Sequence, residues 1–508
     1  MRMLEILALI AACALLISAQ VPTGTIHGAI TDDSGAVVPN ANATIMNKTT
    51  GVVRATQANA QGLYSAPALF AGQYEVRVEG EGFATLVRDA TVEVGNTTLV
   101  DMNLHLGTRK DIVTVVAATS QMNYEAHNIQ GVIDRNLIDA LPLNGRSYMQ
   151  LASLEPGVTV TPFYIGQFNT LFLVNGPGSG TYSTQFTIDG GNVSDNVDTG
   201  SGVSSMNFSP EIVEEFQISY LNFDPGAALT SGGAISVVTR SGGNHYHGSG
   251  YFYFRDHNIA AYPALNRNPL FPDPFFVRRN PGFWLSGPLK KDNLFFFFNY
   301  EYLNQVQSVT VQPNLPSLAG LAATFGSPYA AKQIGLRLDY HLSAKHNAFL
   351  RYSHDGNDGF ADVFSNGYPS NWTHNKNWAD QSILGLTSTL TPALVNEVRF
   401  QYMYWSNHNT QATPSDCLYP CLGSTLPSLF TILGSNFGLG NAAVGPNFDS
   451  PVTRNTRRYQ TMDTLSWQKG RHRLRFGLIW TALSPPENLD SALRSALGHS
   501  RRNMCVVC

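Results

Sequence analysis

The sequence predicts a mainly β protein in three successive parts: a small β-sandwich, a mixed α/β segment and a partial antiparallel transmembrane β-barrel. Short β-rich runs separated by turn residues come first, glycine-rich sequence with two short helical patterns follows, and long apolar/polar alternation fills the second half. Only 13% of the 508 residues are charged and 11% are aromatic, which is typical of neither a disordered chain nor a polytopic helical protein. A net charge of −4 provides no basic surface for nucleic acid.

The N-terminus has the pattern of an export signal. Arg2 precedes an apolar run over residues 6–17, which leads into the small residue Ala19. The run has about a dozen residues, whereas a transmembrane helix needs roughly 20. We therefore predict a cleaved signal peptide over residues 1–19, with cleavage between Ala19 and Gln20.

Residues 22–106 show the spacing of a small sandwich. Tyr74, Val76 and Val78 alternate with charged residues, the period-two pattern of a half-buried strand. Turn residues separate this run from similar ones. The expected strands cover residues 25–31, 43–46, 52–55, 74–78 and 90–94.

This region resembles a carboxypeptidase regulatory-like domain, a prealbumin-like sandwich sometimes grouped with carbohydrate-binding-like folds. The resemblance rests on the run GTIHGAITDDSGAVVP from Gly24, and on the later GLY and GQYEV runs. It implies a module without catalytic residues. We expect Tyr64, Phe70 and Phe83 to be core or edge residues rather than a sugar-stacking surface, because large aromatic side chains usually bury area.

A β-branched run follows in the linker over residues 107–120. The chain resembles the TonB-dependent transporters, in which such a segment, the TonB box, adds as a strand to an energising periplasmic protein. The resemblance implies that the TonB box of this chain consists of Asp111, Ile112, Val113, Thr114 and Val115. An ordinary linker or a first strand of the next segment is the alternative, since any Val/Thr run has strand propensity.

Residues 121–243 mix short helices, strands and glycines, and we expect them to form an α+β plug domain. A helix is predicted from the N-cap candidate Asp134 to a proline stop. The run LPLNGRSYMQLASLEPGV from Leu141 resembles the start of the plug in Oar-like, acidobacterial-type TonB-dependent receptors, and blocks beginning at Phe186, Val213 and Gly232 continue the resemblance in order.

The loop over residues 189–198 is rich in oxygen ligands, but its spacing does not fit an EF-hand. We expect a turn that satisfies its own backbone, because Asn, Asp and Gly are ordinary turn residues.

The pattern of residues 244–482 predicts membrane-spanning strands. Alternation extends over about ten residues in several runs, the length of a tilted strand in a bilayer. Short joints at 343–345 and 469–470 resemble periplasmic hairpins, whereas residues 304–330, 355–379 and 406–454 are expected to be long extracellular loops.

About nine such strands can be counted, while a barrel that holds a plug has on the order of 22. After Trp480 the alternation stops, and residues 483–508 read as an aberrant tail. The expectation is a C-terminally truncated transporter. Cys417 and Cys421 could form a small disulfide staple, whereas the spacing of Cys505 and Cys508 is taken as accidental.

The sequence contains no recognisable catalytic motif, so we expect no enzyme activity, catalytic residue, metal site or cofactor. The predicted function is active uptake of a scarce nutrient (oligosaccharide, peptide or metal chelate) across the outer membrane of a Gram-negative bacterium. Its expected partners are a TonB-type periplasmic energy transducer, outer-membrane lipid and an unknown small substrate, with the N-terminal domain in the periplasm. The alternatives are a non-transporting surface or periplasmic glycan- or protein-binding protein, and a non-functional transporter remnant.

Overall fold

The computed structural model describes most of the chain. The described residues are 22–107, 112–115, 129–143, 145–162, 172–175, 184–194, 204–221, 233–261, 273–311, 316, 320, 322–361, 368–416, 430–436, 441–444, 450–484 and 505–506. The expected signal peptide with its Ala19–Gln20 cleavage site, Asp111, and the proposed staple of Cys417 and Cys421 lie outside these residues.

The N-terminal domain is a sandwich of two sheets. One sheet has the order β4-β1-β7, with β8 also pairing with β1, and the other has the order β3-β2-β5-β6-β9. Its strands are β1 (Gly24–Asp32), β2 (Asn42–Asn47), β3 (Val53–Gln57), β4 (Leu63–Leu69), β5 (Gly72–Glu79), β6 (Thr85–Val92), β7 (Thr97–Leu99), β8 (Met102–Leu104) and β9 (Ile112–Val115).

The core of the sandwich follows the predicted alternation. Tyr74, Val76 and Val78 are buried in one cluster with Ile26 and Ile45. The strand expected at residues 90–94 instead begins at Thr85. Strands β4, β7 and β8 were not predicted, because β4 is the proline-containing run LYSAPAL and the other two have only three residues each.

The plug region, residues 121–243, forms a five-stranded sheet of order β10-β15-β16-β13-β14. The predicted helix is α2, and Asp134 caps it by accepting a hydrogen bond from the Leu137 amide at 2.9 Å. The elements are β10 (Ile129–Ile133), α2 (Arg135–Ala140), η2 (Tyr148–Leu154), β11 (Thr159–Pro162), β12 (Phe172–Asn175), β13 (Thr184–Ile188), β14 (Gly191–Asn192), η3 (Pro210–Ile212), β15 (Val213–Leu221) and β16 (Gly233–Thr239).

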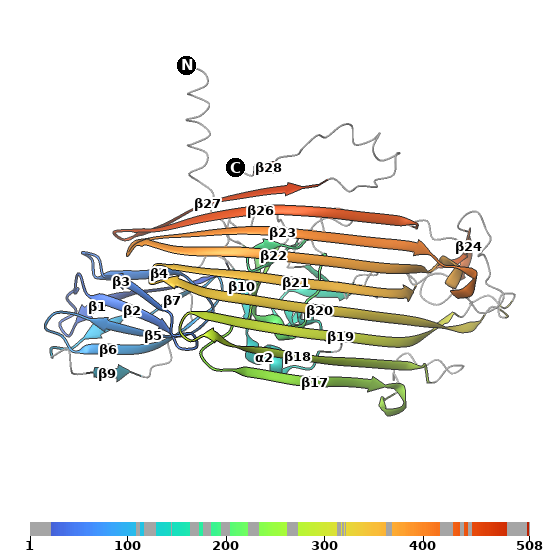
Figure 1. Cartoon of the computed structure of the whole chain (residues 1–508), viewed down its shortest axis with the longest axis horizontal. Coiled ribbons are helices and arrows are strands. Elements are labelled where there is room, and N and C mark those ends of the chain that lie inside the picture. Colours follow the sequence, from blue (N-terminus) through green and yellow to red (C-terminus); the bar gives the residue numbers. More distant parts are fainter. Residues whose placement is uncertain are drawn as a thin grey trace, which may run out of the picture.

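The second half of the chain is one antiparallel sheet whose strands follow each other in sequence order (Figure 1). Its strands are β17 (His247–Asp256), β18 (Phe276–Lys290), β19 (Leu294–Val311), β20 (Ala323–Ser343), β21 (His346–Ala361), β22 (Thr373–Thr391), β23 (Leu394–Gln411), β26 (Val452–Lys469), β27 (His472–Leu483) and β28 (Cys505–Val506). Short elements lie between them: η5 (His257–Ile259), η7 (Pro369–Asn371), η8 (Pro414–Asp416), β24 (Phe430–Asn436) and β25 (Asn441–Val444).

The two faces of this sheet have opposite polarity. Leu350 and Leu384, which pair across β21 and β22, face outward and are 45% and 53% exposed, whereas the next residue, Arg351, is fully buried on the inner face. Such a sheet suits an apolar solvent outside and a polar interior. Among the described residues, no helix is long and apolar enough to cross a bilayer.

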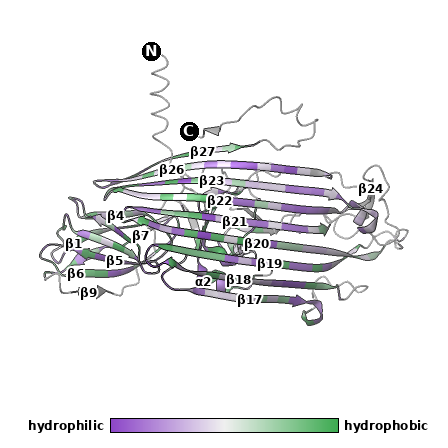
Figure 2. Ribbon diagram, in the orientation of Figure 1, coloured by the Kyte–Doolittle hydropathy of each residue, from purple (hydrophilic) through white to green (hydrophobic). Residues whose placement is uncertain are grey.

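The strands extend further than predicted, so the expected loops at 304–330, 355–379 and 406–454 were too long. Strand β19 continues to Val311 and β20 starts at Ala323; β21 and β23 also run past the expected loop starts. Hydrophilic residues prevail toward the ends of β22, β23 and β26 that lie away from the N-terminal domain (Figure 2). These ends are polar on both faces, so they lose the alternation from which strands were predicted.

Candidate functional site

A buried charge cluster joins the plug region to the barrel wall. Asp189, in the turn after β13, lies 2.7 Å from Arg351 and 3.4 Å from Arg337 (carboxylate oxygen to guanidinium nitrogen). Thr239 at the end of β16 donates to the same carboxylate through its hydroxyl at 2.7 Å and its amide at 3.0 Å. Burial alone would raise the pKa of Asp189, but the two guanidinium groups hold it below its usual value.

The prediction for Asp189 was therefore incomplete. Asp189 and Gly190 do form a turn, with φ angles of +46° and +86°. The Asp189 side chain, however, bonds across to β20, β21 and β16 instead of satisfying its own loop. The signal in the sequence is the carboxylate that directly follows the buried run of β13, although its partners are about 150 residues away.

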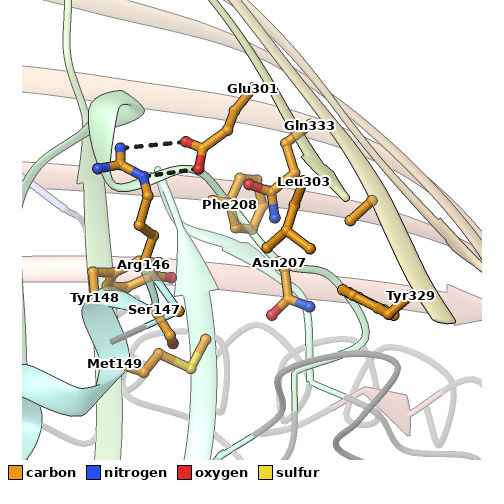
Figure 3. Close-up of a pocket in the computed structure, with 12 residues that line it drawn as sticks. Arg146, Ser147, Tyr148, Met149, Asn207, Phe208, Glu301, Leu303, Tyr329 and Gln333 are labelled. Carbon is orange, nitrogen blue, oxygen red and sulfur yellow. Dashed lines mark hydrogen bonds and ion pairs between the residues drawn. The ribbon is translucent and has the colours of Figure 1, made fainter. Parts of the chain in front are cut away.

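A second ionic contact involves Arg146, which belongs to the LPLNGRSY run. Positive φ angles at Gly145 and Arg146 (+87° and +56°) turn the chain so that this guanidinium points at the wall. It lies 2.8 Å from Glu301 of β19 (Figure 3). It also lies 2.8 Å from Glu211 of the plug region. The Tyr251 hydroxyl also donates to Glu301, at 2.9 Å. This network borders a small cavity of about 30 Å³.

A third contact is made mostly of amides. Arg458 of β26 donates to the Asn192 carbonyl at 2.7 Å, and Gln401 of β23 donates to the same carbonyl at 2.9 Å. The Asn192 amide in turn donates to Gln460 at 3.0 Å. Polar contacts of this kind link the plug region to five wall strands, namely β19, β20, β21, β23 and β26.

A glycine in the barrel wall allows the plug region to approach closely at one position. A Cβ atom built on Gly335 of β20 would lie 2.3 Å from the Ile212 side chain and 2.3 Å from the Asn299 side chain. Glycine therefore permits η3 to approach the wall closely.

The N-terminal domain is bonded to the turns of the barrel sheet. Thr56 donates to the Pro392 carbonyl at 3.1 Å, and Asn59 donates to the Gly470 carbonyl at 2.9 Å. Asn244, just before β17, donates to the Thr50 carbonyl at 3.0 Å. The domain thus lies against the end of the sheet that carries the short hairpins, as Figure 1 shows.

The N-terminal domain makes two further contacts, one with the inner face of the barrel sheet and one with the plug region. The Phe70 ring meets the inward-facing Phe349 edge to face at 5.9 Å. In the plug region, Glu215 accepts a hydrogen bond from the Val94 amide of the N-terminal domain. Burial raises the pKa of the Glu215 carboxyl to about 8, so this group is mostly protonated at neutral pH.

The three aromatic residues considered as possible sugar contacts all pack against other parts of the protein. Tyr64 is fully buried and donates to the Val100 carbonyl at 2.6 Å, and Phe83 packs against the core of the sandwich. Phe70 contacts the barrel wall. Among the described residues, no group of three His, Cys, Asp or Glu side chains could hold a metal ion.

The predicted TonB-box residues Ile112–Val115 form β9, which pairs in parallel with β6 from Thr85 to Arg88. They therefore form a strand at the edge of the N-terminal domain. Their pairing with a periplasmic partner stays a prediction.

The fold defines a class: an outer-membrane-type β-sheet around an inner α/β region, preceded by a sandwich domain. The sequence matches the family described as "Outer membrane beta barrel domain" over residues 238–331 and 326–492. It matches the "Carboxypeptidase regulatory-like domain" family over residues 25–105. The chain therefore belongs to the outer membrane β-barrel family and is an outer-membrane protein with an N-terminal regulatory-like domain.

The chain is also similar to individual proteins. The TonB-dependent transporter Oar of Myxococcus xanthus is 26% identical over 258 residues, which cover 48% of this chain and 23% of that protein. The outer membrane transporter YddB from Escherichia coli has a TM-score of 0.50 at 10% identity, covering 70% of this chain and 48% of that one. The P. aeruginosa protein FpvA, solved with bound pyoverdines, has a TM-score of 0.42 at 12% identity, covering 72% and 53%. The chain thus spans about half the length of these solved structures and 23% of the curated relative.

Proposed function

We propose that this chain is part of an energy-coupled outer-membrane receptor that takes up a scarce nutrient. The observation that carries the proposal is an inner region held against the concave face of a membrane-type sheet by buried charged and amide contacts, beside an apolar cluster that includes Phe297, Met403 and Trp405 of the wall. In the Asp189 cluster, one buried carboxylate of the plug region meets two guanidinium groups of the wall. Water can replace such contacts when the region moves, whereas a large apolar interface would resist hydration.

The source of movement in this proposal is the strand over residues 112–115, which precedes the plug region. A periplasmic energy transducer would pair with this strand, and a pull on it would act on the plug region through the chain that follows. The cargo belongs to the classes predicted from the sequence: an oligosaccharide, a peptide or a metal chelate.

A proline substitution tests the role of the strand. Val113→Pro removes a backbone N–H and should weaken binding of the chain to the periplasmic domain of a TonB-type protein at least about tenfold, because strand addition depends on main-chain hydrogen bonds. Val113→Thr, which keeps strand propensity, is the matched control. Affinity would be measured by calorimetry on the full chain in detergent.

In cells that carry a complete version of the receptor, Val113→Pro should abolish uptake while surface binding of the cargo persists. Equal transducer binding by the proline and threonine variants would refute the assignment of residues 111–115.

A further inference from the structure

A chamber of about 370 Å³ lies where the N-terminal domain, the plug region and the barrel wall meet. The N-terminal domain contributes the β2–β3 hairpin and the turn after β4, and the plug region contributes the end of β16. Strands β18 to β22 form the remaining wall. Its volume falls within the roughly 300–1,000 Å³ of small-molecule sites, which often occur between domains.

One wall of the chamber carries a buried cation that forms no ion pair with any described residue. Arg54 of β3 is 7% exposed. Its guanidinium donates to the Pro67 carbonyl at 3.4 Å, and no carboxylate of the described residues lies within 4 Å of it. Burial lowers the pKa of Arg54, and the charge of Glu397 opposes this effect, but that carboxylate is itself bonded to Arg399 at 2.9 Å. Buried charges in proteins are normally paired.

A second cation comes from the plug region. The Arg240 guanidinium lies 4.0 Å from the centre of the Trp284 ring and only loosely pairs with Glu214, at 3.9 Å. Burial raises the pKa of the Glu214 carboxyl, which weakens this pairing further. The other acidic residue in the lining, Asp339, is bonded to Arg337 at 2.8 Å. The chamber therefore has an excess of positive charge.

The rest of the lining mixes neutral polar residues, such as Asn47 and Thr387, with an apolar group. Ile45, Leu69 and Phe70 come from the N-terminal domain, and Trp284 and Phe295 come from the wall. A ligand that satisfies both parts has an anionic head and an apolar body.

We propose that this chamber binds a small organic anion, a carboxylate on an apolar body of about the size of an aromatic ring, with Arg54 and Arg240 as its anion ligands. The anion comes from the periplasm, because the periplasmic N-terminal domain forms one wall and the plug region fills the opposite side. A ligand that contacts both of these units binds only when they are docked, so it stabilises the docked arrangement.

The test uses three probes on the full chain in detergent micelles: phenylacetate, its uncharged amide phenylacetamide, and acetate. Calorimetry should show saturable binding of phenylacetate, with affinity at least about tenfold lower for each of the other two probes, because one lacks the charge and the other the apolar body. Arg54→Met should weaken phenylacetate binding by about tenfold or more. Arg54→Lys should retain part of the affinity, and Arg77→Met, on β5 of the same sheet and outside the chamber, should retain all of it.

Arg240→Met provides a second variant if loss of Arg54 destabilises the N-terminal domain. Phenylacetate should also slow the hydrogen exchange of residues 49–52 in the parent chain but not in Arg240→Met. No saturable binding of phenylacetate, equal binding of phenylacetamide, or equal affinity of Arg54→Met and Arg77→Met would each overturn the proposal. None of these measurements involves the energy transducer, so they are independent of the proposed uptake function.

Discussion

The N-terminal domain buries mainly apolar side chains, whereas the barrel sheet buries charged and amide side chains as well. In the N-terminal domain, alternate residues such as Ile45 and Val76 meet between two sheets and are fully buried. In the barrel sheet, the aliphatic Leu350 and Leu384 lie outside, while the charged Arg351 and the amide Gln381 are fully buried inside. Both regions have the same period of two.

The comparison shows that alternation reports which residues share a face, and that the surroundings decide which face is inside. The sandwich closes in water, so its apolar face must meet another apolar face. The barrel sheet has lipid outside, so it can keep aliphatic side chains there and bury charged and amide side chains inside, beside apolar ones. The two regions should therefore respond differently to matched substitutions.

The largest change in stability is expected on removal of Asp189, the carboxylate that two buried arginines of the barrel sheet share. Asp189→Ala would leave Arg337 and Arg351 buried without their shared partner and should destabilise the plug region by about 3–5 kcal/mol. Pulse proteolysis in urea would measure this change. Asp33→Ala, which removes an exposed carboxylate of the N-terminal domain, should cost less than about 0.5 kcal/mol. Similar costs for the two variants would show that the interior does not depend on this cluster.

A smaller effect is expected on the lipid face. Leu384→Arg places a charge near the middle of β22 and should cost about 2–4 kcal/mol when the protein folds into lipid vesicles. Leu384→Val serves as the control. If Leu384→Arg folds into vesicles as well as the control does, this face does not contact lipid.

The smallest effect concerns the junction of the two regions and depends on pH. The pKa of Glu215 is raised from 4.5 to about 8 by burial in the docked state. The docked state therefore binds this proton more tightly than the undocked state does. The resulting stabilisation of docking is fully present below about pH 4.5 and is lost as the pH rises through about 8.

We expect the N-terminal domain to become more accessible to protease over this pH range, because ionisation of the buried carboxyl disfavours the docked state. Glu215→Gln, which cannot ionise, should remove the pH dependence. A parent and a glutamine variant with the same pH profile would contradict this role.

Much of the fold could be read from local sequence. The alternation of Tyr74, Val76 and Val78 predicted a strand, Asp134 predicted a helix start, and the hairpins at 343–345 and 469–470 fall between observed strands. These features depend on residues that are close in the chain. The lengths of the barrel strands were harder to predict, because their polar ends pair through the backbone, which carries no side-chain signal.

The candidate sites could be predicted only in part. Arg337 stands between Leu336 and Leu338 in the sequence, and this alternation puts it on the polar face of its strand, but nothing near it in the sequence indicates Asp189 as its partner. The chamber is less predictable still, since Arg54, Arg240 and Trp284 come from three separate parts of the chain.

The sequence by itself determined the class of protein, the order of its parts and the faces of its strands, because periodicity and turn chemistry act over a few residues. Only the tertiary structure decided which charges meet inside the sheet and where the N-terminal domain docks. These contacts join residues that can be more than 400 positions apart, as Asn59 and Gly470 are, and local sequence carries no record of such partners.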